Sequence, residues 1–526
     1  MKMRSMAALT AILVVAPLAA VAPGPQAVAQ SRSGDSARSA ESTLVGGIDL
    51  DTVTIPELQA RMDRGSLSSV RLTLAYLRRI KAVDPKINAV LHVSPTALGQ
   101  AVASDVRHRL GRTRGPLDGI PVLLKDNVDT RDMPTTAGSL ALAGKPPASD
   151  AELVAKLRAG GAVILGKANL SEWANFRAAK PTSGWSAVGG QTHNPYVLDR
   201  NPCGSSAGSA AALAASLAQV AIGTETDGSI VCPAGMNAVV GLKPSLGLVS
   251  QSGVVPISAE QDTAGPMARN VTDTALTLSV LSGRDPDPGL AEAASRPGAL
   301  RGKRIGLWRL PALGAEVDAL MTRTAERLRA SGAEVVEVDL PYQERLAELE
   351  FPALLSEFHR DIDAYLATRK GPRDLAALIE FNRAHPQEQT CFAGQELFEQ
   401  ALAAPPTTDP EYLAMRAELA DLSRRSIDEV MTEHGLDAIA SPANPPAWTT
   451  DCGRGDNDVI PSSTPAAVAG YPSLSVPAGF VGELPVGLLL MAGNHQDADL
   501  LALGAAVEHR LDGRRAPRYL PTLPTG

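Results

Sequence analysis

Cysteine is scarce in this chain, with four residues out of 526. No two of them are spaced as C-x-x-C, and the H-E-x-x-H sequence of metalloprotease helices does not occur. Because these are common spacings of protein metal ligands, we expect no metal site. No other motif points to a cofactor, so any chemistry has to come from the side chains themselves.

Basic runs are also missing. The chain has 57 acidic residues against 49 Lys and Arg residues, a formal net charge of −8 at pH 7. An acidic chain without a cluster of positive charge does not attract phosphate backbones or anionic lipid. We therefore expect neither nucleic acid nor an anionic membrane as a partner.

Long apolar runs are confined to the amino terminus. Lys2 and Arg4 precede an apolar stretch at 7–22, and residues 27–29 read Ala-Val-Ala, a small-residue cleavage site. This pattern is typical of a secretory signal peptide cleaved near Ala29. The alternative is an uncleaved membrane anchor, but the stretch is short for a bilayer and interrupted by proline. We expect a secreted or periplasmic protein that is not membrane-bound after cleavage.

Export makes a disulfide possible. Cys391 and Cys452 lie in the second half of the chain and are the better candidates for a bridge. Cys203 and Cys232 lie inside glycine- and serine-rich segments and are interpreted as small packing residues.

Strand and helix patterns alternate along the chain. Helical spacing and caps predict helices at 54–64, 69–83, 151–159, 207–220 and 315–330. Short apolar runs predict strands at 120–124, 163–165, 304–308 and 334–338. Such alternation favours an α/β fold in which helices cover both faces of a sheet.

The chain has no internal repeat, and we interpret it as one folded domain at about 50–513. We assign about 1–29 to a signal peptide, 30–49 to a disordered segment and 514–526 to a tail. Within the domain we assign about 70–283 to a catalytic core, 284–303 to a Pro- and Gly-rich linker and 304–513 to a second half.

Three motifs carry the candidate chemistry: LKDN at 124–127, CGSSAGS at 203–209 and GTETDGSI at 223–230. A serine hydroxyl is a weak nucleophile, which needs a base and a set of donors for the developing oxyanion. One lysine and two turns rich in Gly and Ser can supply both without a histidine. The motifs therefore indicate a hydrolase that attacks with serine.

In this order the motifs resemble the amidase signature family, whose core reads Gly-Ser-Ser-Gly-Gly-Ser, an Ala-rich helix, Gly-Thr-Asp-x-Gly-Gly-Ser-Ile-Arg and Gly-Leu-Lys-Pro. The likeness runs from about residue 50 to 511 and includes GLKP at 241–244. Glu225, Asp227 and Val231 depart from the family pattern. The GTETDGS variant looks most like the branch of peptide amidases, which remove the C-terminal amide of peptides. The resemblance implies a central mixed, twisted sheet.

The resemblance also implies roles for the motif residues. Ser229 is the expected nucleophile, and Lys125 the expected base, acting through Ser205. The lysine has to be neutral to accept a proton, which burial favours. The peptide bond between Gly204 and Ser205 is expected to be cis. The oxyanion hole is expected from the backbone N–H groups of Thr226, Asp227, Gly228 and Ser229.

Substrate contacts are expected from Ser139, Ser206 and Asp227. Ser139 lies in a loop that covers the substrate in the family. Ser206 either caps the helix that follows it or donates within the catalytic network. The Asp227 carboxylate either meets a cationic or amide group of the substrate or caps its own turn, and the sequence favours neither.

Other assignments of these residues are possible. Gly204-x-Ser206-x-Gly208 fits the nucleophile elbow of α/β-hydrolases, which would make Ser206 the nucleophile and require a downstream histidine. No strand pattern directly precedes this segment, and the family-wide match favours Ser229. Lys125 could instead be a surface lysine paired with Asp126. A thiol amidase built on one of the two motif cysteines is a further alternative.

We therefore expect an exported serine amidase that acts as a monomer or homodimer on C-terminal peptide amides or other primary amides and releases ammonia. An aryl acylamidase or a carbamate-cleaving hydrolase of the same family is the alternative. A non-catalytic binding protein of this fold should have lost Lys125, Ser205 or Ser229. The amide-cleaving component of an aminoacyl-tRNA amidotransferase needs cytosolic partners, which the signal peptide disfavours.

Overall fold

The computed structural model describes residues 41–282, 288–293, 300–391, 393–457 and 462–524. The signal peptide, residues 30–40 of the expected disordered segment, and residues 284–287 and 294–299 of the expected linker lie outside the described residues. Within the linker, 288–293 form a helix, α9 (Pro288–Ala293). Residues 44–49, which we assigned to the disordered segment, form a small hairpin of β1 (Leu44–Val45) and β2 (Ile48–Asp49).

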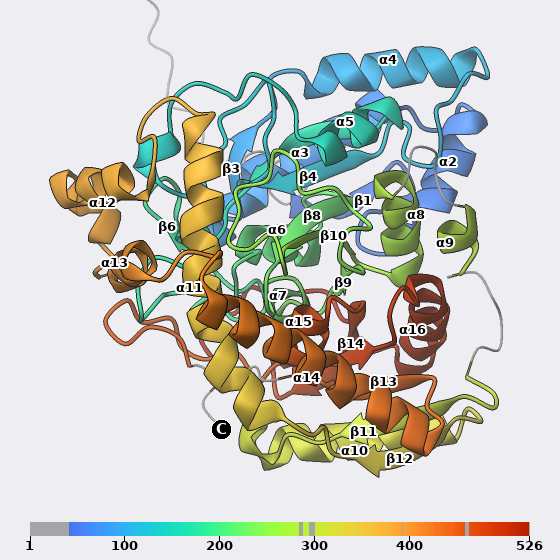
Figure 1. The fold of residues 1–526 in the computed structure, drawn as a ribbon. Coiled ribbons are helices and arrows are strands. Elements are labelled where there is room, and N and C mark those ends of the chain that lie inside the picture. Colours follow the sequence, from blue (N-terminus) through green and yellow to red (C-terminus); the bar gives the residue numbers. More distant parts are fainter. Residues whose placement is uncertain (1–40, 283–287, 294–299, 392, 458–461, 525–526) are drawn as a thin grey trace, which may run out of the picture. The chain divides into compact units, whose positions relative to one another are not determined.

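A mixed sheet of 11 strands forms the centre of the folded unit (Figure 1). β11 is parallel to both β12 and β13, β4 is parallel to both β5 and β8, and the other neighbours are antiparallel. From one edge to the other the order is β12 (Glu334–Val338), β11 (Arg304–Trp308), β13 (Ala438–Pro442), β15 (Leu484–Met491), β14 (Ser473–Val481), β9 (Val240–Lys243), β10 (Thr263–Ala268), β8 (Val220–Glu225), β4 (Pro121–Lys125), β5 (Val163–Ala168) and β3 (Val90–Val93). A separate pair is formed by β6 (Trp185–Ser186) and β7 (Gly190–Gln191).

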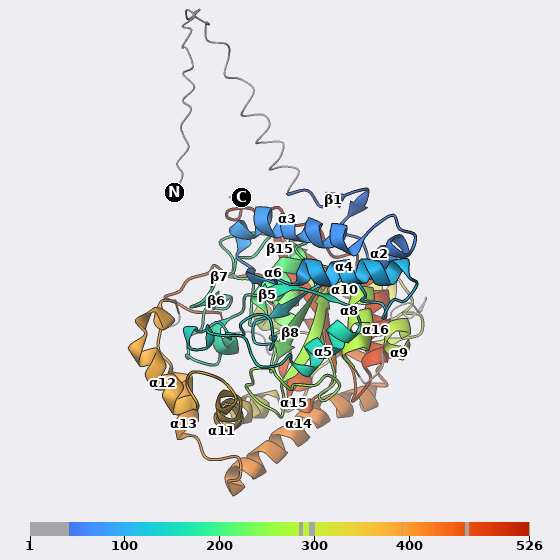
Figure 2. The ribbon, with the colours of Figure 1, turned by 90° about the horizontal axis from the view of Figure 1, so that it is seen from above.

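Helices flank this sheet, as Figures 1 and 2 show from two directions. Those of the first half are α2 (Ile55–Asp63), α3 (Ser69–Ile87), α4 (Ala97–Arg109), α5 (Glu152–Ala159), α6 (Ala207–Ala214), α7 (Val231–Met236) and α8 (Val271–Leu281). Those of the second half are α10 (Ala315–Arg329), α11 (Gln343–Ala367), α12 (Leu375–Ala384), α13 (Glu396–Ala403), α14 (Pro410–His434), α15 (Thr464–Ala469) and α16 (Asp497–Leu511). The α/β class and the mixed sheet with flanking helices are confirmed.

The strands in the middle of the sheet are buried along their whole length. Every residue of β4 and of β8 is buried, as expected for parallel strands covered on both faces. α6 is also buried throughout, because its Ala, Gly and Ser side chains let it lie close against β4, β5 and β8. A sheet that is buried on both faces holds the residues at its strand ends in fixed positions.

The Ala-rich helix is shorter than we predicted. We expected 207–220, but α6 ends at Ala214 and β8 begins at Val220. Alanine favours helix locally, whereas the β-branched Val220 and Ile222 pair with Val122 and Leu124 in the sheet. Tertiary pairing therefore decided where the helix ends.

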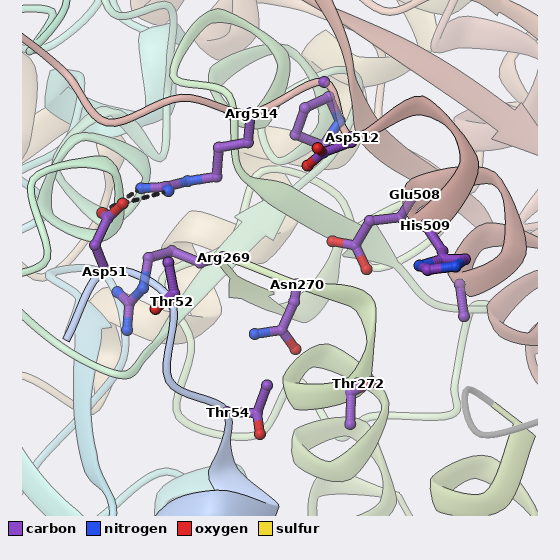
Figure 3. Close-up of a pocket in the computed structure, with 13 residues that line it drawn as sticks. Asp51, Thr52, Thr54, Arg269, Asn270, Thr272, Glu508, His509, Asp512 and Arg514 are labelled. Carbon is purple, nitrogen blue, oxygen red and sulfur yellow. Dashed lines mark hydrogen bonds and ion pairs between the residues drawn. The ribbon is translucent and has the colours of Figure 1, made fainter. Parts of the chain in front are cut away.

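The two ends of the folded unit lie next to each other (Figure 3). Arg514 donates to both carboxylate oxygens of Asp51, at 2.8 and 2.7 Å, and Leu520 pairs with Val197. A cavity of about 650 Å³ separates this ion pair from the start of α8 and the end of α16. The segment 514–520, which we assigned to a tail, is thus packed against the domain.

Candidate active site

Lys125 is the last residue of β4, and the parallel strand β8 lies beside it. The carboxyl ends of parallel neighbours meet at the same edge of a sheet, so Lys125 lies against Thr224 near the end of β8. Lys125 Nζ is 3.1 Å from the carbonyl oxygen of Thr224, 2.9 Å from its hydroxyl and 2.7 Å from the hydroxyl of Ser205. The lysine and the relay serine expected from the sequence are therefore in contact.

Lys125 is fully buried, and burial lowers the pKa of its amine to about 7, although the nearby carboxylates of Asp262 and Glu225 oppose this shift. It is not the surface lysine paired with Asp126 that we considered. Asp126 instead pairs with the buried Lys167 at 3.2 Å. At neutral pH a substantial fraction of Lys125 is therefore uncharged.

The neighbours of Lys125 suit a neutral amine. Such an amine has two N–H donors and one lone pair, whereas an ammonium has three donors and no acceptor. The Thr224 carbonyl can only accept, but the Ser205 hydroxyl can donate to the lone pair. Asn127 Nδ2 donates to the Thr224 hydroxyl at 2.9 Å and so fixes that group too. When Lys125 is neutral and donates to both oxygens of Thr224, its lone pair is left for the hydroxyl of Ser205.

Ser205 follows a cis peptide bond with Gly204, as we predicted. A Cβ atom at Gly204 would lie 2.2 Å from the Ser171 hydroxyl and 2.8 Å from the Ser183 hydroxyl, so only glycine fits here. The Ser205 carbonyl accepts from the N–H of Ser171 at 3.1 Å. Gly204 and Ser205 are thus held against the segment 171–183.

Ser229 lies in the loop between β8 and α7. The preceding Gly228 has φ +76°, a conformation that favours glycine. Glu225 holds the other side of the loop, where its carboxylate accepts from the N–H groups of Ile230 and Val231 at 2.6 and 2.9 Å. Lys125 and Ser205 are fully buried, whereas Ser229 is partly exposed and lines a cavity.

The same loop presents backbone donors beside Ser229. The N–H groups of Ile230 and Val231 are already bonded to Glu225. In the part of the chain that the structure describes, the N–H groups of Asp227, Gly228 and Ser229 have no such partner. Donors left unpaired at a turn are the means by which an oxyanion is held.

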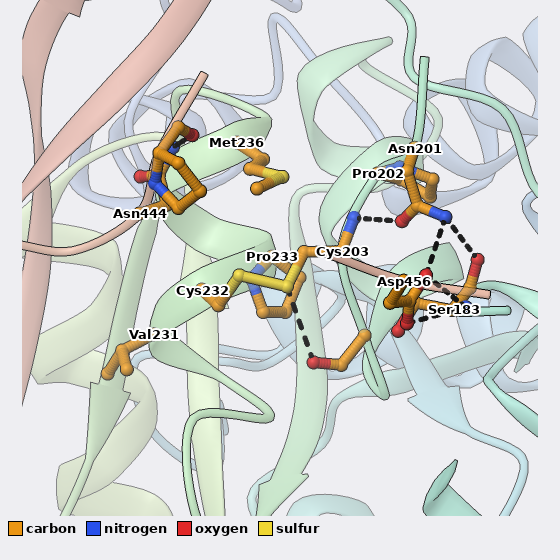
Figure 4. The surroundings of a disulfide bond; sticks show 12 residues. Ser183, Asn201, Pro202, Cys203, Val231, Cys232, Pro233, Met236, Asn444 and Asp456 are labelled. Carbon is orange, nitrogen blue, oxygen red and sulfur yellow. Dashed lines mark hydrogen bonds between the residues drawn. A yellow bond between two sulfur atoms is a disulfide. The ribbon is translucent and has the colours of Figure 1, made fainter. Parts of the chain in front are cut away.

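The turn that holds Ser205 and the turn that holds Ser229 are tied together twice. The N–H of Ser206 donates to the carbonyl oxygen of Ser229 at 3.1 Å. A disulfide also joins Cys203 to Cys232, with Cα atoms 6.1 Å apart (Figure 4). Our interpretation of these two cysteines as packing residues was wrong, and as a disulfide they cannot provide a thiol nucleophile.

The second disulfide, Cys391–Cys452, is the one that we predicted, and its Cα atoms are 4.7 Å apart. Sequence patterns gave no sign of the first bridge, because the residues of that pair belong to two turns which only the sheet brings together.

Two adjoining cavities lie at this site. The first, of about 550 Å³, contains Ser229, Gly204 and Asp227 in its wall. The second, of about 650 Å³, shares Asn175, Pro181 and Asp227 with the first. Four large apolar side chains line the second cavity, those of Phe176, Phe351, Leu354 and Leu397. A substrate whose reacting carbon lies at Ser229 can therefore extend past Asp227 into an apolar space.

The three expected substrate contacts differ in position. Asp227 faces both cavities, and its carboxylate accepts from the Thr464 hydroxyl at 2.6 Å, so it does not cap its own turn. Ser206 is buried, and its hydroxyl bonds to the backbone N–H and carbonyl of Thr224 instead of capping α6. Ser139 is buried too, and its hydroxyl donates to Glu388 at 3.2 Å. Neither serine lines the two cavities.

Sequence reasoning missed several groups that hold the site. Thr224 and Asn127 orient the lysine, and Glu225 fixes the loop of Ser229. Asp262 accepts from the Thr226 hydroxyl at 2.5 Å, and burial raises the pKa of this carboxyl to about 7. Thr224 and Asn127 lie inside the recognised motifs and could have been examined there, but Asp262 lies outside them.

Across the described residues, no group of three or more His, Cys, Asp or Glu side chains is arranged to hold a metal ion. No helix in this part of the chain is long and apolar enough to cross a membrane.

Comparison with known proteins shows a consistent likeness. A sequence model of the family described as amidase matches residues 71–501. A protein of Arabidopsis thaliana named a probable amidase is 37% identical over 501 residues, covering 91% of this chain and 93% of that protein. A glutamyl-tRNA(Gln) amidotransferase component of Chloroflexus aggregans is 34% identical over 485 residues, covering 88% of this chain and 97% of that component.

Among solved structures, the chain is similar to the peptide amidase from Stenotrophomonas maltophilia. The two are 48% identical with a TM-score of 0.84, covering 89% of this chain and 99% of that one. A structure of the peptide amidase PAM in complex with the competitive inhibitor chymostatin gives 49% identity and a TM-score of 0.85, with the same coverage.

Proposed function

The chain belongs to the amidase family and is a hydrolase that acts on amide bonds, and from this we propose that it is an exported serine amidase that removes ammonia from the C-terminal amides of peptides. The observation that carries the proposal is the contact between the buried Lys125 amine and the Ser205 hydroxyl at 2.7 Å, next to the turn that presents Ser229.

In the first step, Lys125 accepts the Ser205 proton while Ser205 takes the proton of Ser229, whose Oγ attacks the amide carbon. A base with a pKa near the working pH suits this role, because it is free to accept a proton and can return it. The pKa of about 7 for Lys125 meets that condition. The N–H groups of residues 226–229 stabilise the resulting oxyanion.

In the second step the tetrahedral intermediate breaks its C–N bond. The relay returns the proton to the leaving nitrogen, ammonia departs, and the acyl group stays on Ser229 as an ester. Water then attacks the ester with the same relay as base, and the carboxylic acid is released. The overall reaction consumes one water for each amide cleaved.

The choice of peptide amides rests on similarity and on the shape of the site. Peptide amidases are similar to this chain at 48 and 49% identity, against 34% for the amidotransferase component. The second cavity offers room for side chains on the acyl side of the reacting amide.

Export rests on the amino-terminal pattern at 1–29. Two disulfides accord with it, because disulfides persist in oxidising compartments and are rare in the cytosol.

Ammonia release from a panel of peptide amides, aryl amides and carbamates tests the substrate class, and peptide amides should be the best substrates. Ser229→Ala, Ser205→Ala and Lys125→Ala should each lower kcat by orders of magnitude while near-UV circular dichroism stays native, because the relay works as a unit. Ser206→Ala should lower it less. An active Ser229→Ala enzyme together with an inactive Ser206→Ala enzyme would instead assign the reaction to a nucleophile elbow.

A further inference from the structure

The two cavities beside Ser229 have an acidic lining. Among the described residues in their walls, every charged side chain is a carboxylate: Asp227, Glu350 and Asp456. Asp227 is shared by both cavities, and Glu350 lies in the second one only. Asp456 accepts bonds from the N–H of Ser183 and from Trp448, so its charge is already partly satisfied.

Asp227 and Glu350 come from distant parts of the chain and face each other. Asp227 lies in the loop of the nucleophile, and Glu350 lies on α11 of the second half. Both side chains line the second cavity, and the charge of Asp227 acts on Glu350. Asp227 Oδ1 is buried and has no hydrogen-bond partner in the described part of the chain, and two carboxylates in one cavity wall repel each other when both are ionised.

The surroundings of the pair offer polar contacts but no ion pair. Gln261 Nε2 donates to Glu350 Oε1 at 2.9 Å, and the hydroxyl of Thr464 donates to Asp227. Arg416, whose charge acts on Glu350, donates to the Gln261 side chain at 2.8 Å and pairs with Glu357. Among the described residues no cation bonds to either member of the pair.

Burial raises the pKa of both carboxyl groups, and the charge of Asp227 raises that of Glu350 further. The buried Lys243 behind the loop acts against this shift for Asp227, and Arg416 acts against it for Glu350. A positive charge delivered from the cavity favours the ionised form of both carboxyl groups.

We propose that Asp227 and Glu350 form a cation-binding subsite on the acyl side of the cleft, which selects amides that carry an ammonium or guanidinium group. This inference rests on the proposed amidase function and assigns part of its substrate class. Phe176, Phe351 and Leu354 pack against the aliphatic part of such a side chain, as long basic residues bury their stems.

The same lining acts on the product. Hydrolysis turns a neutral amide into a carboxylate, which an acidic cleft repels. The subsite therefore favours a neutral C-terminal amide with a cation nearby over the acid that it becomes. This charge change speeds the departure of the product.

Two pairs of substrates test the proposal at pH 7.0 by ammonia release. N-acetyl-lysinamide against N-acetyl-norleucinamide isolates a side-chain ammonium, and phenylalaninamide against N-acetyl-phenylalaninamide isolates an α-ammonium. In at least one pair we expect the wild-type enzyme to prefer the cationic member by about tenfold or more in kcat/KM. The pair that shows the preference identifies which cation is bound.

Glu350→Gln should reduce that preference by about tenfold, because only one of the two carboxylates that face the cation remains. Glu348→Gln is the matched control, as it removes the same charge from the same helix at an exposed position that pairs with Arg345. An unchanged preference in Glu350→Gln, or an equal loss in both variants, would overturn the proposal.

The wild-type measurement does not depend on either variant folding. Equal kcat/KM values within both substrate pairs would refute the cation subsite and leave the amidase assignment standing. Failure to release ammonia from every amide would refute the amidase function itself.

Discussion

The acid limb of the pH–rate profile should report the protonation of Lys125. Burial lowers the pKa of this lysine from 10.5 to about 7. Only the neutral amine can accept the proton of Ser205. For an uncharged amide, kcat/KM should therefore be level above about pH 8 and fall tenfold per pH unit below 7, to about one hundredth at pH 5.

Asp262→Asn tests whether the limb belongs to Lys125. The Asp262 carboxylate raises the pKa of Lys125, and the pKa of Asp262 itself is also about 7. Removing its charge should move the acid limb to lower pH. Loss of the limb in this variant would assign it to Asp262, and a profile that is flat from pH 5 to 9 in the wild type would refute the lysine base.

The same pKa shift predicts an effect on stability. Because the native pKa is lowered, the unfolded chain binds more protons between about pH 7 and 10.5, and stability rises with pH in that window. The full cost, on the order of 5 kcal/mol for a shift of about 3.5 units, applies below pH 7. Lys125→Met lacks this dependence. Its free energy of unfolding relative to the wild type should drop by about 2 kcal/mol from pH 7 to pH 9 in urea titrations. No change in that difference would contradict the shifted pKa.

Three further outcomes are expected. Phe358→Ala should lower the free energy of unfolding by about 3–5 kcal/mol in urea titrations, since this ring is only 1% exposed and packs against two others; a loss below about 1 kcal/mol would contradict that packing. Peptide mapping without reductant should find Cys203–Cys232 and Cys391–Cys452, and free thiols at all four positions would refute both bridges. Replacing the first pair by alanine should lower kcat even at temperatures where the variant is fully folded, because the bridge joins the turns that hold Ser205 and Ser229. Treatment with EDTA should leave ammonia release unchanged, and full inactivation would show a metal requirement.

Local sequence was sufficient to identify the motif residues and several elements. Strands 304–308 and 334–338 have the predicted limits, because apolar runs between turn residues are local signals. Lys125 was correctly expected at the end of a strand. Helix α3, in contrast, continues to Ile87 beyond the predicted end at 83, and α5 begins at Glu152.

Alternatives that depend on side-chain direction could not be decided from the sequence. Ser206 has the same local pattern whether it caps α6 or bonds to Thr224, and only the neighbouring strand β8 makes the second arrangement possible. The Asp227 carboxylate was left between two interpretations for the same reason. The Thr464 hydroxyl that donates to it and the Glu350 side chain that shares its cavity wall come from the second half of the chain.

The sequence by itself determined which residues are able to react: a lysine, two serines and a glycine turn, each set within a few neighbours. The tertiary structure decided what those residues experience. The parallel pairing of β4 with β8 buries Lys125 against Thr224 and lowers its pKa, and the packing of α11 brings Glu350 to the cleft. Chemical identity and turn conformation are properties of short segments. Desolvation and charge proximity depend on which distant segments the sheet brings together, and no local pattern encodes them.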